Sequence, residues 1–255
     1  MLLTIDVGNT GMGLGIFEDK DLRVSWRLST SISRMSDEYA AIFLSLLRNE
    51  NLAPKDITDV CLCSVVPPTI STLETMFQRY FHVKPLIVGT GTKTGVKIRM
   101  DNPREVGADR IVHGAAAYQL YGGPLIIVDL GTATTFDTIS KNGEYTGGAI
   151  APGIQTGAEA LFARTAMLPR VNLTRPQKAI GTNTVSAMQS GIVFGYISLI
   201  EGMVARIQKE MTEKAKVILT GGYLDIIAKE SNIFDIVNPN LIFIGLRMVY
   251  AMNKV

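Results

Sequence analysis

Two stretches of the sequence are alike: LLTIDVGNT at residues 2–10 and LIIVDLGTATT at residues 125–135. Each is a short apolar run that closes on Asp, an apolar residue and Gly, and each continues with small hydroxyl or amide residues. Two further strand-like segments follow each stretch, separated by the turn-forming residues DKD at 19–21 and KNG at 141–143. The repetition predicts that each half of the chain begins with a meander of three strands.

After each meander the apolar residues change to helical spacing. In the first half the pattern predicts a helix over residues 37–50, a strand over 60–66, a helix over 69–80 and a strand over 85–88. In the second half it predicts a helix over 154–164, one or two helices within 184–212, a strand over 216–219 and a closing helix over 240–251. Two βββαβα units indicate a two-lobed α/β fold with mixed sheets. We expect the boundary in or just after a helix over 107–121, which gives lobes of residues 1–115 and 116–255.

The composition is that of a folded protein. Of 255 residues, 47% are hydrophobic and 19% charged, which excludes a disordered chain. The net charge of +2 does not indicate electrostatic binding of nucleic acid. The two cysteines, Cys61 and Cys63, are too close together for a disulfide framework, and free cysteines fit a reducing cytosol.

No segment of the sequence predicts export or a membrane span. The first residues lack the basic region of a signal peptide. The longest apolar stretch, residues 191–204, is shorter than the roughly 20 residues of a span and contains Glu201, so we expect a buried helix. These features predict a cytoplasmic protein that binds neither membranes nor nucleic acid.

The two Asp-x-Gly turns have the composition of phosphate-binding loops. Glycine lets the backbone approach a ligand closely, and hydroxyl and amide groups can donate to phosphate oxygens. The candidate donors are Asn9, Thr10, Gly11, Thr132 and Thr134. An Asp at a strand end, Asp6 or Asp129, can hold Mg²⁺, which accompanies phosphates. Two such turns facing each other would hold a polyphosphate from both sides, whereas a single copy is more simply an ordinary turn with an Asx hydrogen bond.

A second cluster, NPREVGADR at residues 102–110, combines an acid and a base at a predicted helix start. Asp109 could accept a proton from a hydroxyl substrate, while Arg110 holds a carboxylate or phosphate. The alternative is an Asp that favours the helix dipole beside a solvated Arg, and from the residues alone this alternative is the stronger. His113, one turn further on, is expected to be a half-buried helix residue.

With these motifs in this order, the chain resembles the type III pantothenate kinases, members of the acetate and sugar kinase/Hsp70/actin superfamily. The resemblance covers essentially the whole chain. It rests on DVGNT at 6–10, SVVP at 64–67, NPREVGADR at 102–110, DLGTATT at 129–135, GGAIAPG at 147–153, NTVSAMQSG at 183–191 and TGG at 220–222. It implies a duplicated ribonuclease H-like, or actin-like ATPase, fold. It also implies ATP-dependent phosphorylation of pantothenate to 4′-phosphopantothenate, the first step of coenzyme A synthesis, by a homodimer.

The resemblance assigns roles to individual residues. Asp109 is the implied proton acceptor. The implied ATP-binding residues are Asp6, Val7, Gly8, Asn9, Thr10, Gly11, Met12, Gly13 and Thr132. The implied pantothenate-binding residues are Gly107, Ala108, Asp109, Arg110 and Thr184. Asp129 is implied to help hold a potassium or ammonium ion. From its place at a strand end, we expect Asp6 to place the Mg²⁺ that comes with ATP.

One position departs from the family pattern. Met100 stands where many members carry a Tyr that contacts substrate, so a phenol hydrogen bond is lost there. Two other functions stay open at this point: a phosphohydrolase of the same superfamily, and a non-catalytic transcription accessory protein on the same scaffold. ATP consumption that does not depend on pantothenate would favour the phosphohydrolase. Failure to turn over pantothenate would favour the accessory protein.

Overall fold

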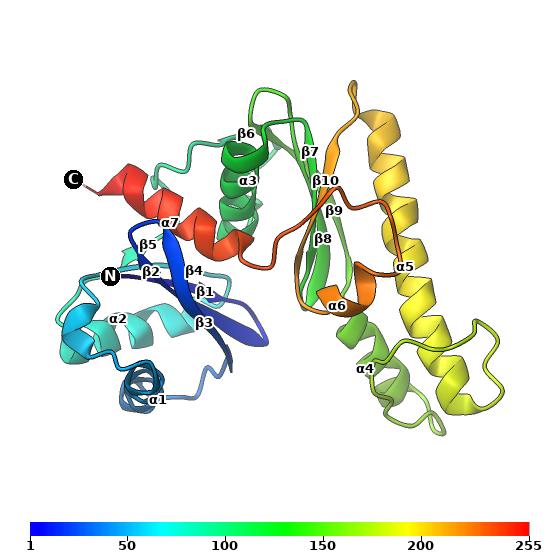
Figure 1. Ribbon diagram of the computed structural model, residues 1–255, viewed down its shortest axis with the longest axis horizontal. Coiled ribbons are helices and arrows are strands. Elements are labelled where there is room, and N and C mark those ends of the chain that lie inside the picture. Colours follow the sequence, from blue (N-terminus) through cyan, green and yellow to red (C-terminus); the bar gives the residue numbers. More distant parts are fainter. Residues whose placement is uncertain (255) are drawn as a thin grey trace. The chain divides into compact units, whose positions relative to one another are not determined.

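The computed structural model describes residues 1–254 and forms two compact units, each built on its own mixed sheet (Figure 1). The first unit contains Met1–Gly95, Asn102–Ala116 and the residues from Leu241 onward; the second contains Val96–Asp101 and Ala117–Asn240. One division falls within helix α3 (Ala108–Tyr121), between Ala116 and Ala117. The predicted α/β class with two mixed sheets is confirmed.

The first sheet has the strand order β3-β2-β1-β4-β5. Its strands are β1 (Leu2–Val7), β2 (Gly11–Glu18), β3 (Asp21–Ser29), β4 (Asp59–Ser64) and β5 (Leu86–Ile87). The first three form the predicted antiparallel meander, and β4 and β5 continue the sheet in parallel with β1. Two short 3₁₀ turns, Pro54–Asp56 and Pro103–Glu105, precede β4 and α3.

Helices α1 (Ser36–Asn49) and α2 (Pro68–Tyr80) cover one face of this sheet (Figure 1). In α1 the buried residues Tyr39, Phe43 and Leu47 recur every fourth position, which gives the helix one apolar side. Phe43 meets Phe77 of α2 edge to face, with ring centroids 5.8 Å apart. These contacts join both helices to a common core.

Helix α7 (Leu241–Asn253) packs on the opposite face of the first sheet (Figure 1). Its residues Phe243 and Leu246 share a buried cluster with Cys61 and Cys63 of β4. This packing explains why the unit bounds differ from the expected lobes 1–115 and 116–255: α7 is apolar and covers a sheet face that α1 and α2 leave open.

A polar contact also fixes α7 to the first sheet. The hydroxyl of Tyr250 donates to the carboxylate of Asp59, the first residue of β4. Thr58 donates to the same carboxylate over 2.7 Å, and Lys254 lies 3.6 Å from it. Burial opposes ionisation, but these partners prevail and lower the pKa of Asp59.

The second sheet has the strand order β11-β10-β7-β8-β9-β6. Its strands are β6 (Lys97–Ile98), β7 (Leu125–Leu130), β8 (Ala133–Ile139), β9 (Glu144–Pro152), β10 (Lys216–Gly221) and β11 (Ile236–Val237). β7, β8 and β9 form the second predicted meander, and β10 and β11 run parallel to β7. The short β6 pairs in parallel with β9.

Helices α4 (Ile154–Arg164), α5 (Thr184–Glu210) and the short α6 (Leu224–Ile227) belong to the second unit. The segment over residues 184–212 forms one continuous helix rather than two. The side of α5 that carries Val193, Ile197 and Ile200 is buried with β7 and β10 in one core. By length and composition α5 could also cross a membrane, although one third of its most apolar window is already buried within the protein. Core helices of globular proteins meet the same criterion.

The two sheets place equivalent residues at equivalent positions. Asp6 on β1 lies between Gly13 of β2 and Cys63 of β4. Asp129 on β7 lies between β8 and β10 in the same way. Each of these carboxylates therefore sits one residue before the end of a central strand, with a parallel neighbour on one side and a hairpin partner on the other.

Candidate active site

The first loop, residues 8–10, connects β1 to β2 through a tight turn. The amide of Gly8 donates to the carbonyl of Gly11 over 2.9 Å, and a Cβ at Gly8 would lie only 3.1 Å from that oxygen. Thr30 fixes the loop, since its hydroxyl donates to the Gly8 carbonyl and its amide to the Thr10 carbonyl. Asn9 and Thr10 are exposed. The loop is thus a short, fixed turn with polar groups at its tip.

The predicted ATP-binding residues on either side of this loop differ in accessibility. Val7 and Met12 are fully buried in the hydrophobic core, so only their backbone atoms could meet a nucleotide. Gly13 packs against Phe243 of α7, where a Cβ would lie 3.0 Å from the ring. The small residue there makes room for the helix.

The second loop, residues 131–132, repeats this turn. The amide of Gly131 donates to the carbonyl of Ala133 over 3.0 Å, and a Cβ at Gly131 would lie 3.2 Å from that oxygen. The Thr132 carbonyl accepts from the amide of Gly153 and the hydroxyl of Thr156, over 3.1 and 2.7 Å. The likeness of the two sequence motifs therefore extends to the hydrogen bonding of their turns.

The hydroxyl of Thr134, one of the predicted phosphate donors, is not accessible. Its side chain is fully buried, and its hydroxyl forms a hydrogen bond with the hydroxyl of Tyr196 on α5. Burial raises the pKa of Tyr196, so this phenol stays protonated. Thr134 and Tyr196 thus join the second loop to α5, whereas Thr132 is exposed.

Asp129 is surrounded by the start of the second loop and the end of β10. Gly221 of β10 has a φ of +98°, and a Cβ at this position would lie 2.5 Å from Oδ1 of Asp129. It would also lie 2.6 Å from the backbone of Leu130. The Thr-Gly-Gly turn is a weak signal in the sequence, but its first glycine is needed in the fold because it leaves space for the Asp129 carboxylate.

Asp109 lies in the first turn of α3, and its carboxylate turns back over the helix start. Its Oδ1 accepts from the amide of Arg110 over 2.9 Å. A Cβ at Gly107 would lie 2.4 Å from the same oxygen, so a larger residue here would displace the carboxylate from this position. Just upstream, the side chain of Asn102 accepts from the amide of Arg104 and shapes the approach to the helix. His113 is buried on α3, more deeply than the sequence indicated.

Within the first unit, the structure brings Asp6 and Asp109 to the same thiol. The Sγ of Cys63 donates to Oδ1 of Asp6 over 3.3 Å. Burial raises the pKa of Cys63 well above its usual value, and the negative charges of Asp6 and Asp109 raise it further. The aspartate beside the first loop and the aspartate of α3, far apart in sequence, therefore lie close enough to act on one buried group.

The donor set limits how a metal could be held. Across residues 1–254, no three His, Cys, Asp or Glu side chains gather into a group that could hold a metal ion. Mg²⁺ in phosphate-transfer sites usually keeps several waters and binds one or two carboxylates together with substrate phosphates. Single carboxylates beside the loops, Asp6 and Asp129, fit that mode. Oxygen donors of this kind also suit a monovalent cation such as potassium.

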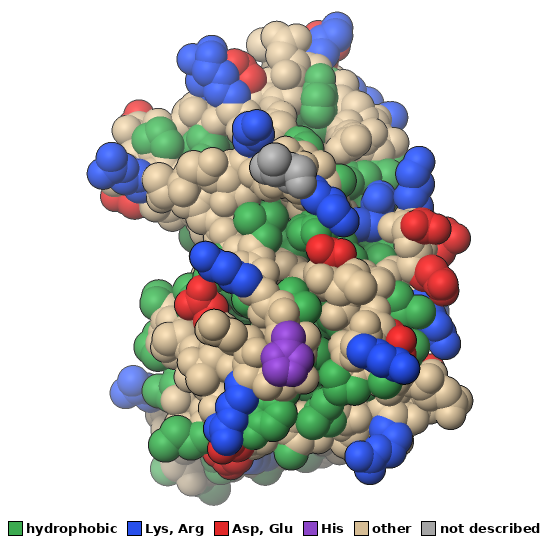
Figure 2. Space-filling model, turned by 90° about the vertical axis from the view of Figure 1, so that its left-hand side faces the viewer, with side chains coloured by type: hydrophobic (Ala, Val, Ile, Leu, Met, Phe, Trp, Pro, Cys, Tyr) green, Lys and Arg blue, Asp and Glu red, His purple; other side chains and the backbone are tan. Residues whose placement is uncertain are grey.

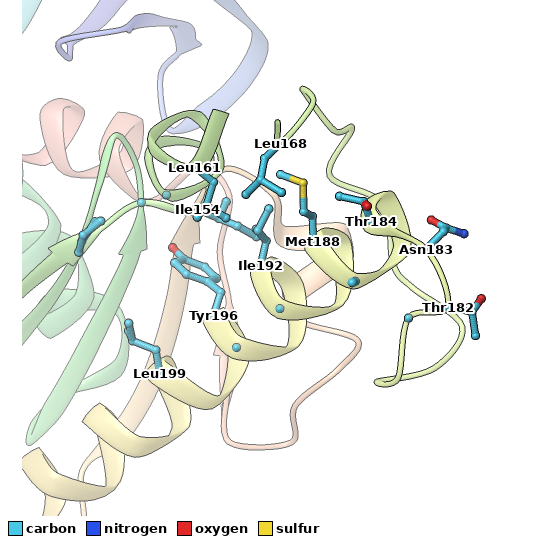
Figure 3. Close-up of a pocket in the computed structure, with 17 residues that line it drawn as sticks. Ile154, Leu161, Leu168, Thr182, Asn183, Thr184, Met188, Ile192, Tyr196 and Leu199 are labelled. Carbon is cyan, nitrogen blue, oxygen red and sulfur yellow. The ribbon is translucent and has the colours of Figure 1, made fainter. Parts of the chain in front are cut away.

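A pocket of about 830 Å³ lies between α4, α5 and the segment that connects them (Figure 3). Met188, Ile192 and Tyr196 project from successive turns of α5 on the side of Leu161 and Leu168. Other lining residues, Thr182, Asn183 and Thr184, lie at the start of α5, where Asn183 caps the helix by accepting from the amide of Ser186. Thr184, a predicted pantothenate contact, is exposed. No local pattern predicted the pocket, because its lining comes from separate segments.

Met100, where many relatives carry Tyr, lies in the second unit beside Gly147 of β9. A Cβ at Gly147 would lie 3.3 Å from the Met100 sulfur, and Gly147 has a φ of +120°. The thioether occupies this place as an apolar group.

Sequence relatives cover nearly the whole chain. A family model described as type III pantothenate kinase matches residues 2–206. Type III pantothenate kinases of Dehalococcoides mccartyi strains CBDB1 and 195 are 56% and 55% identical over 254 and 253 residues. These alignments cover 100% and 99% of this chain and 97% and 98% of the relatives.

Solved structures resemble the fold at low sequence identity. A Campylobacter jejuni protein described as a Baf family transcriptional activator superposes with a TM-score of 0.62 at 20% identity and 98% coverage of both chains. A Sinorhizobium meliloti protein described as a 2-dehydro-3-deoxygalactonokinase gives 0.60 at 13% identity, with 100% of this chain and 98% of that chain covered. At such identities the likeness concerns the fold alone.

Proposed function

Since the chain belongs to the type III pantothenate kinase family and phosphorylates pantothenate in coenzyme A synthesis, we propose that Asp109 accepts the proton of the pantothenate hydroxyl. The observation that carries this assignment is the position of Asp109. It lies in the first turn of α3 and shares the surroundings of Cys63 with Asp6. The candidate base thus belongs to the same unit as the carboxylate beside the first loop.

The chemistry is transfer of the γ-phosphoryl group of ATP to an alcohol. The hydroxyl oxygen forms the new bond to phosphorus, the bond to the β-phosphate oxygen breaks, and ADP leaves. The hydroxyl proton passes to Asp109. Because such transition states are loose, positioning and charge neutralisation supply most of the catalysis. We assign the phosphates to the backbone and hydroxyl groups of residues 8–11 and to Thr132.

Pantothenate carries a carboxylate as well as the reacting hydroxyl, so its site requires a cation. Arg110 follows Asp109 on α3 and is assigned to that carboxylate, since guanidinium binds carboxylates through paired hydrogen bonds. The small residues Gly107 and Ala108 leave room at the helix start, and Thr184 completes the assigned contacts. The apolar Met100 is expected to reduce affinity for pantothenate relative to a Tyr.

The metal assignments follow from the donor chemistry. Mg²⁺ bound to ATP neutralises phosphate charge, and Asp6 is the carboxylate assigned to it, directly or through water. A potassium or ammonium ion is assigned to Asp129. Such an ion would supply positive charge in place of a lysine, and neither loop contains one.

We further assign a homodimer to the active enzyme, with α5 in the interface. The exposed side of α5 carries Ala187, Gly191 and Gly195, and a Cβ added at either glycine would meet nothing within 4 Å. A long apolar helix that is only one third buried leaves an apolar surface of the kind that marks protein–protein contacts. We assign a second copy of the chain to this surface.

We also propose that the enzyme is cytoplasmic and binds neither nucleic acid nor membranes. Cys61 and Cys63 are free and buried, as suits a reducing compartment. On the face shown in Figure 2, lysine and arginine side chains are interspersed with acidic and uncharged ones rather than gathered into a basic stripe. Nucleic-acid binding normally requires such a stripe.

ADP release measured with and without pantothenate tests the proposal. We expect release to require pantothenate and to fall when sodium replaces potassium. Asp109→Asn should cut turnover by at least about 100-fold while the fold persists, because an amide oxygen can still accept from the Arg110 amide. Asp101→Asn, at an exposed acid, is the matched control and should be neutral. ADP release without pantothenate would indicate a phosphohydrolase instead, and near-normal turnover of Asp109→Asn would remove the base assignment.

A further inference from the structure

Cys63 stands out among the buried groups that the proposed mechanism does not use. It lies on β4 directly opposite Asp6 of β1, and its side chain has no solvent exposure. Its Sγ donates to Oδ1 of Asp6 over 3.3 Å. A buried cysteine more often serves as a small apolar core residue, so this bond to a functional carboxylate calls for a reason.

Asp6 follows the buried Ile5 and precedes the buried Val7, and its own side chain is only partly buried. A donor that holds one oxygen of a carboxylate limits how the group can rotate. The Cys63 thiol holds Oδ1, which restricts the orientations open to Oδ2. The bond therefore selects an orientation of Asp6 before any nucleotide arrives.

The second carboxylate nearby explains why the donor is neutral. The charges of Asp6 and Asp109 both act on the Cys63 thiol. A lysine in place of Cys63 would pair with both carboxylates and compete for the proton-accepting oxygens of Asp109. A thiol donates one weak hydrogen bond and carries no charge at working pH. It can orient Asp6 without neutralising Asp109.

We propose that Cys63 is a positioning residue: its thiol holds the Asp6 carboxylate in the orientation that receives magnesium-bound ATP. The inference rests on the assignment of the first loop to ATP under the proposed function. It gives Cys63 a part in nucleotide affinity, and leaves proton transfer to Asp109.

Cys61 provides a matched control on the same strand. It lies two residues before Cys63, so it points to the same face of the sheet, and it is equally buried in the cluster formed with α7. Burial raises the pKa of its thiol to about 12. Substitution of either cysteine removes a buried thiol from one core, but only Cys63 bonds to Asp6.

The test is calorimetric binding of a non-hydrolysable ATP analogue with Mg²⁺ to the full-length protein, together with kcat and KM. Cys63→Ala should raise the Kd about fivefold, with a matching rise in KM for ATP and a smaller change in kcat. Cys63→Ser retains a donor and should stay within about twofold of the wild type. Cys61→Ala and Cys61→Ser should lower thermal stability as much as the Cys63 variants, without changing the Kd. If Cys63→Ala does not fold, Cys63→Val, similar in shape and without a donor, takes its place.

Two outcomes would overturn the inference. One is an unchanged Kd in a folded Cys63→Ala or Cys63→Val variant. The other is a Ser variant that binds as weakly as the Ala variant, which would make the effect one of packing. Because binding is measured without turnover, this result is separate from the Asp109→Asn experiment: failure of the base assignment would leave the role of Cys63 standing.

Discussion

Substitution of Gly221 by alanine should disable the cation site that we propose at Asp129. The new Cβ would lie 2.5 Å from Oδ1 of Asp129, whereas ordinary contact begins at 3.4 Å. The carboxylate, or the strand that carries it, must therefore move by about 0.9 Å, and metal sites tolerate deviations of only about 0.2 Å. The positive φ of Gly221 adds about 1–3 kcal/mol of backbone strain.

The expected result is at least a tenfold rise in the potassium concentration that half-saturates activity, which corresponds to about 1.4 kcal/mol of cation binding. The assay is ADP release titrated with potassium at constant ionic strength. Gly122→Ala is the control, because Gly122 also has a positive φ but a Cβ there meets nothing within 4 Å. It should reproduce the strain, seen as a lower melting temperature, and leave the potassium response unchanged.

A folded Gly221→Ala variant with the wild-type potassium response would refute this reasoning. Asp129→Asn provides a second approach, because it removes the charge without the strain or the steric conflict. It too should weaken the response to potassium. If both variants respond as the wild type does, Asp129 does not hold the cation.

Two further predictions concern α7 and α5. Tyr250→Phe should lower the free energy of unfolding by about 1–2 kcal/mol, and Tyr80→Phe, which removes an exposed hydrogen bond to Asp37, by less than about 0.5 kcal/mol. Because the folded-state pKa of Asp59 is lowered, its stabilising contribution is present above about pH 4 and is lost as the pH falls through the folded pKa. The difference in unfolding free energy between wild type and Tyr250→Phe should therefore shrink at acidic pH. Urea unfolding at neutral and acidic pH measures this difference, and a difference that does not change with pH would contradict the prediction. If the proposed homodimer forms through α5, Gly195→Arg should give a monomer in light scattering without lowering the melting temperature of the monomer. A persistent dimer would exclude this face of α5 as the interface.

The meanders and the two Asp-x-Gly turns could be predicted because their signals are local. An apolar run that ends in Asp-x-Gly already indicates a strand followed by a turn. Its recurrence 123 positions later, at Asp6 and Asp129, strengthens that prediction. The turn at Gly8 and the turn at Gly131 then form the same backbone hydrogen bond. Alternation and turn chemistry are sufficient for elements of this kind.

The placement of α7 and the role of Cys63 could not be predicted in this way. The apolar residues of α7 would suit either sheet, and the close approach of Gly245 to Val112 of α3 emerges only in the fold. Cys63 pairs with Asp6 because β4 lies in parallel register beside β1, which no local pattern in β4 specifies. The Thr134 hydroxyl is bonded to Tyr196, which comes from a helix distant in sequence, so its burial could not be predicted either.

The return of α7 to the first sheet has a consequence for biosynthesis. A ribosome releases β1 to β5 early, but the face with Phe17, Cys61 and Cys63 can be covered by α7 only after the whole second unit has emerged. Until then part of this apolar face is accessible to chaperones, whereas all segments of the second unit have already been synthesised. The unit whose synthesis begins first is therefore the last to have all of its segments available for folding.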